Sequence, residues 1–375
     1  MLKYLKHYIP AFTAVVYFVY LLKGYSPTLF LTGFSVFLIV GDYLLPRDTK
    51  IQEFSYPTFL NLSIYINLPI LFVLVLFVTG VFSEDLSLWL KAGDVFGSFL
   101  PTDFVRVNSS LNLLDKISLV IQTSLLIGAL GTVPGHELTH RVASKFDMFI
   151  GNWLLAFSCD CTFAIEHVYG HHKNACFPED PASAAREENI YPFISKAIFN
   201  EHRDGWRIEK NRLEKVGKRS LSVHNRMIIG YLRSLIMAAL VFVVSGWGGV
   251  LCFMICALNA KIFLEAINYI EHYGLVREKG KRMHMRHSWN SNHFLSSIYL
   301  CNVTRHSDHH RLARLKFWEL NPCPEDAPMT PYGYLSMLYL SLIFPFLYRK
   351  VMSKRLLDWD LNYANTEERK LVNLE

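Results

Sequence analysis

Long, nearly uncharged apolar segments constrain the fold of this chain more than any other feature of its sequence. A transmembrane helix needs about 20 predominantly apolar residues, and six segments meet this requirement closely enough to be predicted as spans. They lie at about 8–22, 27–46, 58–82, 117–140, 227–247 and 249–271. With 51% hydrophobic and only 19% charged residues, the chain is also more apolar than ordinary soluble domains. The sequence therefore predicts an all-α integral membrane protein with a bundle of six transmembrane helices.

The rest of the sequence is predicted to form a cytoplasmic lobe on a single membrane domain that comprises residues 1–375. Two polar regions, 141–226 and 272–375, make up this lobe. The second region contains one more apolar stretch, 334–348, which is short and includes Pro345, so we expect it to be interfacial or buried rather than spanning. No small-residue cleavage site follows the first apolar segment, so we expect that segment to be retained rather than removed as a signal peptide.

The distribution of basic residues predicts the orientation of the bundle. Region 141–226 is rich in Lys and Arg, whereas the connection between the third and fourth spans is mainly acidic, through Glu84, Asp85, Asp94 and Asp103. Because cytoplasmic loops carry an excess of Lys and Arg, both termini and both polar regions are predicted to face the cytoplasm, in a multi-pass protein of the cell inner membrane. The same rule accounts for the net charge of +6 without a nucleic-acid partner.

Nine of the 15 histidines lie in four short clusters, HELTH, EHVYGHH, NYIEHYG and RHSDHH. Neutral imidazole is the commonest metal ligand. The first three clusters lie where apolar segments meet the cytoplasm, so spans that converge from one side bring them to a common depth. The sequence therefore predicts a histidine-rich site for two redox-active metal ions, of which iron fits best. The predicted ligands are His136, His140, His167, His171, His172, His272, His306, His309 and His310.

Other metal chemistries account for fewer of these residues. HELTH matches the HExxH signature of zinc peptidases, but a peptidase uses two of its histidines and one further ligand, and zinc takes only four ligands. Paired ExxH carboxylates, which are typical of soluble di-iron bundles, are absent from the sequence. None of the seven cysteines forms a CxxC pair, so a built-in rubredoxin-type iron site is not expected. Any redox partner must then be a separate protein.

The histidine clusters and their flanking residues resemble those of a known family. GHELTHR, EHVYGHHKNACFPEDPASA, NYIEHYGLVR, HSWNSNH and RHSDHH are similar, over about residues 30–310, to the membrane-bound alkane 1-monooxygenases of the histidine-rich fatty acid desaturase and hydroxylase superfamily. NYIEHYG is typical of the alkane and xylene hydroxylase branch. The resemblance implies a bundle of transmembrane helices with a cytoplasmic di-iron site, bound by the nine histidines named above.

The resemblance also implies an activity and its partners. A non-haem di-iron monooxygenase of this kind inserts one oxygen atom of O2 into the terminal methyl group of medium- or long-chain n-alkanes and gives 1-alkanols. It implies that electrons come from rubredoxin and an NAD(P)H-dependent rubredoxin reductase. The apolar hydrocarbon is expected to enter from the membrane lipid.

Two departures from the family pattern leave other substrates open. Val303 and Thr304 stand where the family commonly has Leu-Gln, and the tail at 356–369 is more similar to xylene monooxygenases. Hydroxylation of methyl groups on aromatic rings is therefore the first alternative. An acyl-lipid desaturase or hydroxylase follows, although NYIEHYG speaks against it, and a membrane zinc peptidase comes last.

Acidic residues close to the histidines have a predicted supporting role. A metal-bound imidazole usually donates its second N–H to a carboxylate, which fixes the tautomer of the ring. The candidates for this role are Glu137, Glu166, Glu271, Asp308 and Asp180. Structural or supporting roles are expected for His287 and His293, and no site role for His7, His202 and His224. Arg305 could pair with an acid near the site or meet an electron carrier.

Overall fold

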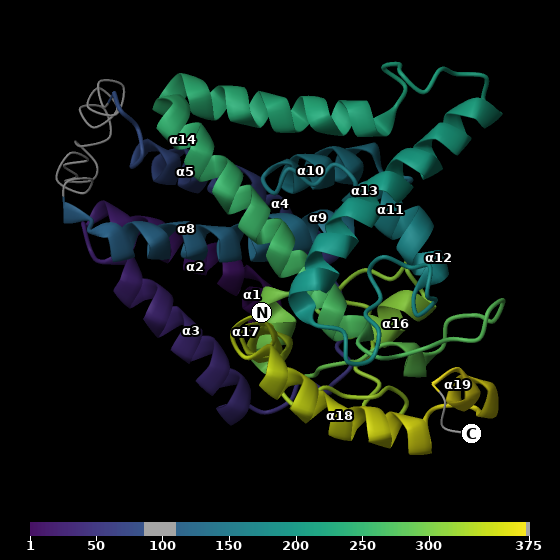
Figure 1. The fold of residues 1–375 in the computed structure, drawn as a ribbon. Coiled ribbons are helices and arrows are strands. Elements are labelled where there is room, and N and C mark those ends of the chain that lie inside the picture. Colours follow the sequence, from purple (N-terminus) through teal and green to yellow (C-terminus); the bar gives the residue numbers. More distant parts are fainter. Residues whose placement is uncertain (86–109, 373–375) are drawn as a thin grey trace.

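A computed structural model describes residues 1–85 and 110–372, and every regular element within these ranges is a helix (Figure 1). Five helical stretches are long and apolar enough to cross a membrane: Lys3–Leu22, Pro27–Leu44, Pro57–Gly80, Leu113–Thr139 and Arg226–His272. The prediction of an all-α membrane protein is thereby confirmed. The acidic connection used to predict the orientation lies mostly outside the described residues, since Asp94 and Asp103 fall between 86 and 109.

The first four predicted spans correspond to four separate helical stretches. They consist of α1 (Leu2–Leu5), η1 (Lys6–Tyr8) and α2 (Ile9–Leu22), then α3 (Pro27–Leu44), then α4 (Pro57–Tyr65) and α5 (Asn67–Gly80), and finally α8 (Leu113–Ile127), η2 (Gly128–Thr132) and α9 (Val133–Thr139). Proline occupies the first turn of α2, α3 and α4. Its missing N–H costs nothing there, because the first N–H groups of a helix have no partner within it.

The fifth and sixth predicted spans lie in one 47-residue element, α14 (Arg226–His272), so the described spans number five by length and composition. Gly246 has φ 63° and ψ −162°, which is not helical, and α14 bends sharply there into two arms (Figure 1). The second arm crosses α8 on its way to His272. The predicted break between the spans 227–247 and 249–271 is therefore a bend at Gly246 within one element.

Shorter helices carry or support the histidine clusters. They are α10 (Lys145–Ala156), α11 (Phe163–Glu166), η3 (His167–His171), α12 (His172–Asn174), α13 (Ile190–Lys215), η4 (Met285–His287), α15 (Phe294–Tyr299), α16 (His306–Arg311), α17 (Tyr334–Ile343), α18 (Pro345–Asn362) and α19 (Thr366–Leu371). The apolar stretch at 334–348 forms the short helix α17, which ends just before Pro345. Its buried Tyr334, Met337 and Leu338 agree with the prediction that this stretch is not a span.

Two large apolar cores pack the helices that carry the histidines. The first joins α2, α5, α8 and the middle of α14, with Leu71, Leu126 and Phe253 at its centre. The second joins the end of α14 to α13, α17 and α18, and contains Tyr269 and Trp359. The helices that carry the histidines are thus held by packing within these two cores.

A close approach between α9 and α10 fixes the position of the first histidine cluster. A Cβ on Gly135 would lie 2.9 Å from Leu155 Cγ, and a Cβ on Gly151 would lie 2.9 Å from Leu138 Cβ. Only glycine at both positions lets the two backbones come this close, as small residues do at interfaces between membrane helices. The next residue along α9 is His136, so this contact sets the depth of its imidazole.

The bend in α14 leads to a first prediction. The φ and ψ of Gly246 lie in a region that is essentially restricted to glycine, and other residues pay about 1–3 kcal/mol to occupy it. Nothing lies within 4 Å of a Cβ at Gly246, so Gly246→Ala tests the backbone alone. We expect this substitution to lower the free energy of unfolding by about 1–3 kcal/mol in detergent-solubilised protein.

Gly33→Ala is the matched control. Gly33 lies inside α3, and a Cβ there also meets nothing within 4 Å. This variant should unfold at the wild-type temperature or slightly above it, because alanine favours a helix more than glycine does. Equal stability of the two variants would contradict the strain that we assign to Gly246.

Candidate metal centre

The two histidines of HELTH lie at the end of the fourth membrane stretch. His136 is in α9, and His140 directly follows its last residue. In a helix, residues i and i+4 share one face, so both rings point the same way from one helix end. This arrangement agrees with the spacing in the sequence.

The second cluster contains a π-helix, so its three histidine side chains point in two different directions. η3 is a π-helix over His167–His171, and π-helices are rare outside short turns at functional sites. In a π-turn, hydrogen bonds join residues i and i+5. This places His167 and His172 together, while His171 points elsewhere.

The remaining four histidines come from two helix ends. His272 is the last residue of α14, and α16 contributes His306, His309 and His310 from a single six-residue helix. Of the three in α16, His306 and His310 are i, i+4 neighbours on one face, and His309 is turned away from them. Each of the last two clusters therefore reaches the same region as the first two.

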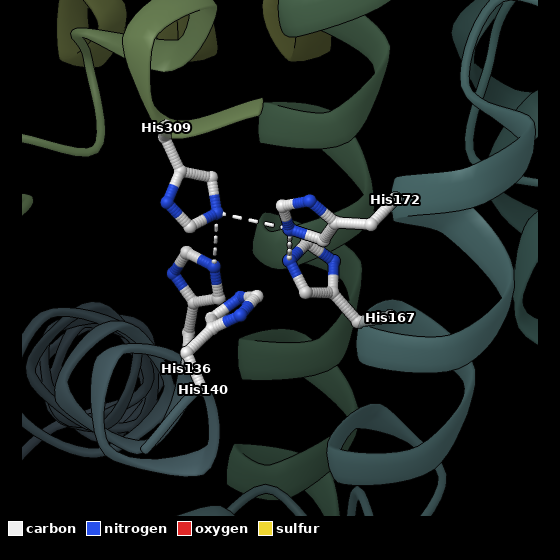
Figure 2. Close-up of side chains that lie close together, drawn as sticks. All are labelled: His136, His140, His167, His172 and His309. Atoms are coloured by element: carbon white, nitrogen blue, oxygen red, sulfur yellow. Dashed lines mark hydrogen bonds between the residues drawn. The ribbon is translucent and has the colours of Figure 1, made fainter. Parts of the chain in front are cut away.

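The structure brings all nine histidines together in two adjacent groups. Group one consists of His136, His140, His167, His172 and His309, and group two of His171, His272, His306 and His310. Within each group, one nitrogen from every ring lies within 4.8 Å of the others. Figure 2 shows the five rings of group one turned toward a common centre. The groups touch through the stacked rings of His172 and His310, whose centroids are 4.4 Å apart.

The separations between nitrogens match those expected around a metal ion. The Nε2 atom of His309 lies 3.0 Å from Nε2 of His136 and 3.0 Å from Nε2 of His172. In group two, Nε2 of His306 lies 2.9 Å from that of His310 and 3.2 Å from that of His272. Imidazole binds zinc-like ions at about 2.0–2.1 Å, so ligand nitrogens at about 90–109° around one ion are separated by about 2.9–3.4 Å.

Hydrogen bonds alone cannot satisfy these nitrogens. An Nε2 atom carries either one proton or one lone pair, so it takes part in one such bond, yet Nε2 of His172 contacts both His167 and His309. The Nε2 atoms of His140 and His171 are buried without any partner. A cation at the centre of each group would satisfy all of these lone pairs, so the residues fit a metal in both groups.

Burial keeps the rings in the protonation state that binds metal. It lowers the pKa of His140 to about 3, with a smaller contribution from His171. Burial, followed by repulsion from neighbouring imidazoles, also lowers the pKa values of other members well below the usual range. These are His167, His172, His306, His309 and His310. These six rings are therefore neutral at physiological pH, and their lone pairs are available.

Two of the five acids named from the sequence contact a histidine of the site. The Oδ2 atom of Asp180 accepts a hydrogen bond from Nδ1 of His171 at 3.0 Å, which leaves Nε2 of that ring facing group two. An oxygen of Glu271 lies 3.3 Å from Nδ1 of His306. Both contacts leave the Nε2 atom of the ring free to bind metal.

The other three acids have different neighbours. Glu137 accepts hydrogen bonds from the guanidinium of Arg141, and Asp308 pairs with Arg311 and Asn321. Glu166 is buried against Gly170, and burial raises its pKa well above the usual range, with smaller contributions from Asp180 and Asp204. An acid that is adjacent to a histidine in the sequence therefore does not necessarily contact a histidine in the structure.

Most of the other residues considered in the sequence have structural contacts. Arg305 is 4% exposed and donates to the carbonyl oxygens of Leu320 and Asp48, so it braces the chain rather than facing a carrier protein. His293 contacts Arg47 and Ser291. His7 packs against Phe54 and Phe317, His202 contacts Thr162 and Tyr231, and His224 is exposed.

A buried ionic cluster beside the histidines was missed at the sequence level. Lys261, on the second arm of α14, lies 2.7–2.8 Å from carboxylate oxygens of Asp160, Glu201 and Glu265. Ionisable residues inside a membrane stretch are costly and usually functional. The signal was available, because Lys261 and Glu265 interrupt an otherwise apolar span at an i, i+4 spacing.

An apolar cavity leads to the histidines. It lies between α8, η2, the second arm of α14 and α17, and its walls include Leu125, Gly128, Ile267 and Leu338. The imidazole rings of His136, His167 and His306 also line the cavity. Since these rings come from both groups, a molecule in the cavity can approach both candidate metal positions.

Comparison with known proteins identifies relatives of this chain. Residues 117–341 match the family model described as fatty acid desaturase, and this range contains all nine histidines. Alkane 1-monooxygenase 2 of Alcanivorax borkumensis is 38% identical over 256 residues, which cover 67% of this chain and 66% of that protein. The alkane 1-monooxygenase of Acinetobacter baylyi is 34% identical over 283 residues, 72% of this chain and 69% of that protein.

A more distant relative is matched over a longer stretch. The xylene/toluene monooxygenase hydroxylase component of Pseudomonas putida is 28% identical over 346 residues, 89% of this chain and 84% of that protein. By contrast, the matches to two alkane 1-monooxygenases of Pseudomonas aeruginosa span 64% of each relative's length. The chain thus spans slightly less than two thirds of several of the alkane relatives.

The two groups predict the metal content of the protein. Full-length protein purified in detergent and loaded anaerobically with Fe²⁺ should hold about two ions per chain, one for each group. His272→Ala removes one of the four nitrogen donors of group two, so we expect about one ion to be lost while group one keeps its own. Elemental analysis by mass spectrometry measures both values.

His224→Ala serves as the control, because His224 is exposed and belongs to neither group. Its metal content should equal that of the wild type. Full metal content in His272→Ala would show that His272 is not a ligand.

Proposed function

This chain belongs to the fatty acid desaturase family, and from its similarity to relatives named alkane 1-monooxygenases we propose that it is a non-haem di-iron monooxygenase. It would insert one oxygen atom of O2 into the terminal methyl group of medium- or long-chain n-alkanes and give 1-alkanols. The observation that carries this proposal is the apolar cavity, which reaches histidines of both groups.

We assign the nine histidines of the two groups as ligands of two iron ions. Imidazole suits several transition metals, but incorporation of oxygen from O2 requires a redox-active ion, and zinc is not one. When bound, iron supplies the activation of O2. The protein contributes neutral nitrogen donors, holds His171 in one tautomer through Asp180, and buries the site away from water.

The cavity is suited to a substrate without polar groups. An alkane offers no hydrogen bond, so its position must come from the shape of the apolar walls. Each methylene buried in such a site gains about 0.8 kcal/mol. In this proposal the length of the cavity would set the chain length that binds best, with the terminal methyl next to His136, His167 and His306, which line the cavity.

Location and partners complete the proposal. We place the protein in the cell inner membrane with both termini and the histidine groups on the cytoplasmic side, as the excess of Lys and Arg in 141–226 supports. Rubredoxin would deliver two electrons, after reduction by an NAD(P)H-dependent rubredoxin reductase. Two protons from water balance the reaction, in which the second oxygen atom of O2 leaves as water.

Hydroxylation of methyl groups on aromatic rings is the second candidate. The observation that favours it is the long match to the xylene/toluene monooxygenase component, which extends over 89% of this chain. The two candidates share the metal site and the chemistry at the methyl group. They differ in the shape of the molecule that the cavity must accept.

A product assay distinguishes the two candidates. Cells that express this chain with a rubredoxin and its reductase would receive n-octane, hexadecane and p-xylene together, and gas chromatography with mass spectrometry would identify the alcohols. We expect 1-octanol or 1-hexadecanol. Formation of 4-methylbenzyl alcohol alone would establish the aromatic alternative.

The same cells carrying His309→Ala provide the control, because His309 contributes a nitrogen to group one. This variant should form none of the products. Alcohols in equal amounts from the variant would show that another enzyme of the host had made them, and would contradict the proposal.

The cavity predicts a change in chain-length preference. Gly128 lines the cavity, and a Cβ at this position meets nothing within 4 Å, so Gly128→Leu would fill open space. Exclusion of about two methylenes, at about 0.8 kcal/mol each, should reduce the activity on hexadecane roughly tenfold. The activity on octane should change much less, and competition between the two alkanes measures the ratio.

Gly33→Leu is the matched control for this substitution, since Gly33 also has open space around its Cβ but does not line this cavity. Its ratio of octane to hexadecane products should be that of the wild type. An unchanged ratio in Gly128→Leu would show that the alkane does not extend past this position.

A further inference from the structure

The ring of His272 is oriented by a backbone carbonyl. Its Nδ1 atom lies 3.0 Å from the carbonyl oxygen of His287. A carbonyl only accepts hydrogen bonds, so Nδ1 of the neutral ring carries the proton and Nε2 keeps its lone pair. That Nε2 atom faces group two, 3.2 Å from Nε2 of His306. Cys176 also donates to the His287 carbonyl, at 3.0 Å, which helps to fix the oxygen.

The position of this carbonyl depends on the side chain of His287, which is fully buried. The Nδ1 atom of His287 accepts a hydrogen bond from the backbone N–H of His284 at 3.0 Å. The proton of the neutral ring is therefore on Nε2, which donates to Oε1 of Glu368 at 2.7 Å. Both nitrogens are used, so the ring and the short helix η4 to which it belongs have one orientation.

Glu368 is the fixed end of this chain of contacts. It lies in α19, close to the C-terminus, and is 1% exposed. Its carboxylate also accepts hydrogen bonds from Nε and Nη2 of Arg286, at 2.8 and 2.9 Å, and from the backbone N–H of Asn365 at 2.9 Å. Burial alone would raise its pKa, but the bonds from His287 and Arg286 lower the pKa to about 2, so the group is an ionised acceptor.

We propose that Glu368 is a positioning residue for the metal ligand His272 and acts through the ring and the carbonyl of His287. The proposal rests on the function proposed above, in which group two holds an iron ion. Glu368 lies beyond residue 341, where the family match ends, so its role does not follow from that match. It gives a function to the tail and adds one to HSWNSNH, in which the Asn290 side chain and the Ser288 carbonyl already accept hydrogen bonds from Ser307 in α16.

The substitution Glu368→Gln tests this role with almost no change of shape. All four bonds to the Glu368 carboxylate are donated by its neighbours. A glutamine has only one oxygen, and its NH2 group would face a donor on His287 or on Arg286 and Asn365. Loss of a partner around a metal-bound histidine typically weakens metal affinity about 10–100-fold. Because Glu368 acts on His272 only through the carbonyl of His287, we expect a loss of affinity at the lower end of this range, about tenfold.

Two control variants separate positioning from general stability. Glu367→Gln removes the same charge from the neighbouring, exposed residue, whose partner is Lys370. Asn365→Ala removes the side-chain cap of α19 but keeps the backbone N–H that bonds Glu368. If Glu368 only stabilised α19, then Asn365→Ala would have the same effect as Glu368→Gln.

The experiment measures release of iron from the full chain in detergent, using a chelator and iron enriched in the Mössbauer-active isotope. We expect Glu368→Gln to lower the affinity for one of the two iron ions about tenfold. The Mössbauer signal of that ion alone should change. Both controls should behave as the wild type. The proposal would be overturned if Glu368→Gln released iron as the wild type does, or if its affinity for both ions fell equally. It would also be overturned if Asn365→Ala had the same effect as Glu368→Gln.

Failure of the di-iron site, the part of the proposed function on which this inference rests, would look different. In that case the wild-type chain itself would not hold two ions, before any variant is compared. The assay follows metal release rather than product formation, so it does not depend on the substrate or on the electron carrier.

Discussion

Nine imidazoles can share so small a buried volume only while they remain uncharged. A protonated ring here would lose its hydration and repel its neighbours in a medium of low dielectric constant. Burial accordingly lowers the pKa of His140 to about 3, and other rings of the two groups follow in the same direction. The neutral rings present lone pairs to one another, which no arrangement of hydrogen bonds can satisfy. The structure around them therefore depends on what occupies the two centres.

Local helix geometry then decides which ring serves which centre. The π-turn in η3 turns His167 and His172 toward group one and leaves His171 for group two. The close contact of α9 with α10, through Gly135 and Gly151, sets the depth of His136. The hydrogen bonds to Asp180 and to the His287 carbonyl then fix the tautomers of His171 and His272. Each element thus determines the orientation of particular nitrogens.

Much of this could be predicted from the sequence, because it depends on short-range periodicity. Apolar runs of sufficient length located the membrane helices, and the i, i+4 spacing of His136 and His140 placed two rings on one face. The division of His167, His171 and His172 could not be predicted, since a π-turn shifts the register that an α-helix would give. The sequence predicts two separate spans, 227–247 and 249–271, because the uncharged residues around Gly246 do not reveal that both belong to one element. Glu368 was missed because its contact with His287 is made only by the folded chain.

A neutral set of ligands leaves the charge of the ions to be balanced by other groups. Buried carboxylates lie near the histidines, such as Asp180, which bonds to His171, and Glu166, which precedes His167, and Lys261 pairs with three further acids. Burial raises the pKa values of Glu166 and Glu201 well above the usual range, while the positive charge of Lys261 acts on both in the opposite direction. Divalent ions in the two groups would lower those pKa values, and metal binding would then release protons into the interior. The acids next to these uncharged ligands would thus supply negative charge to balance the ions in the two groups.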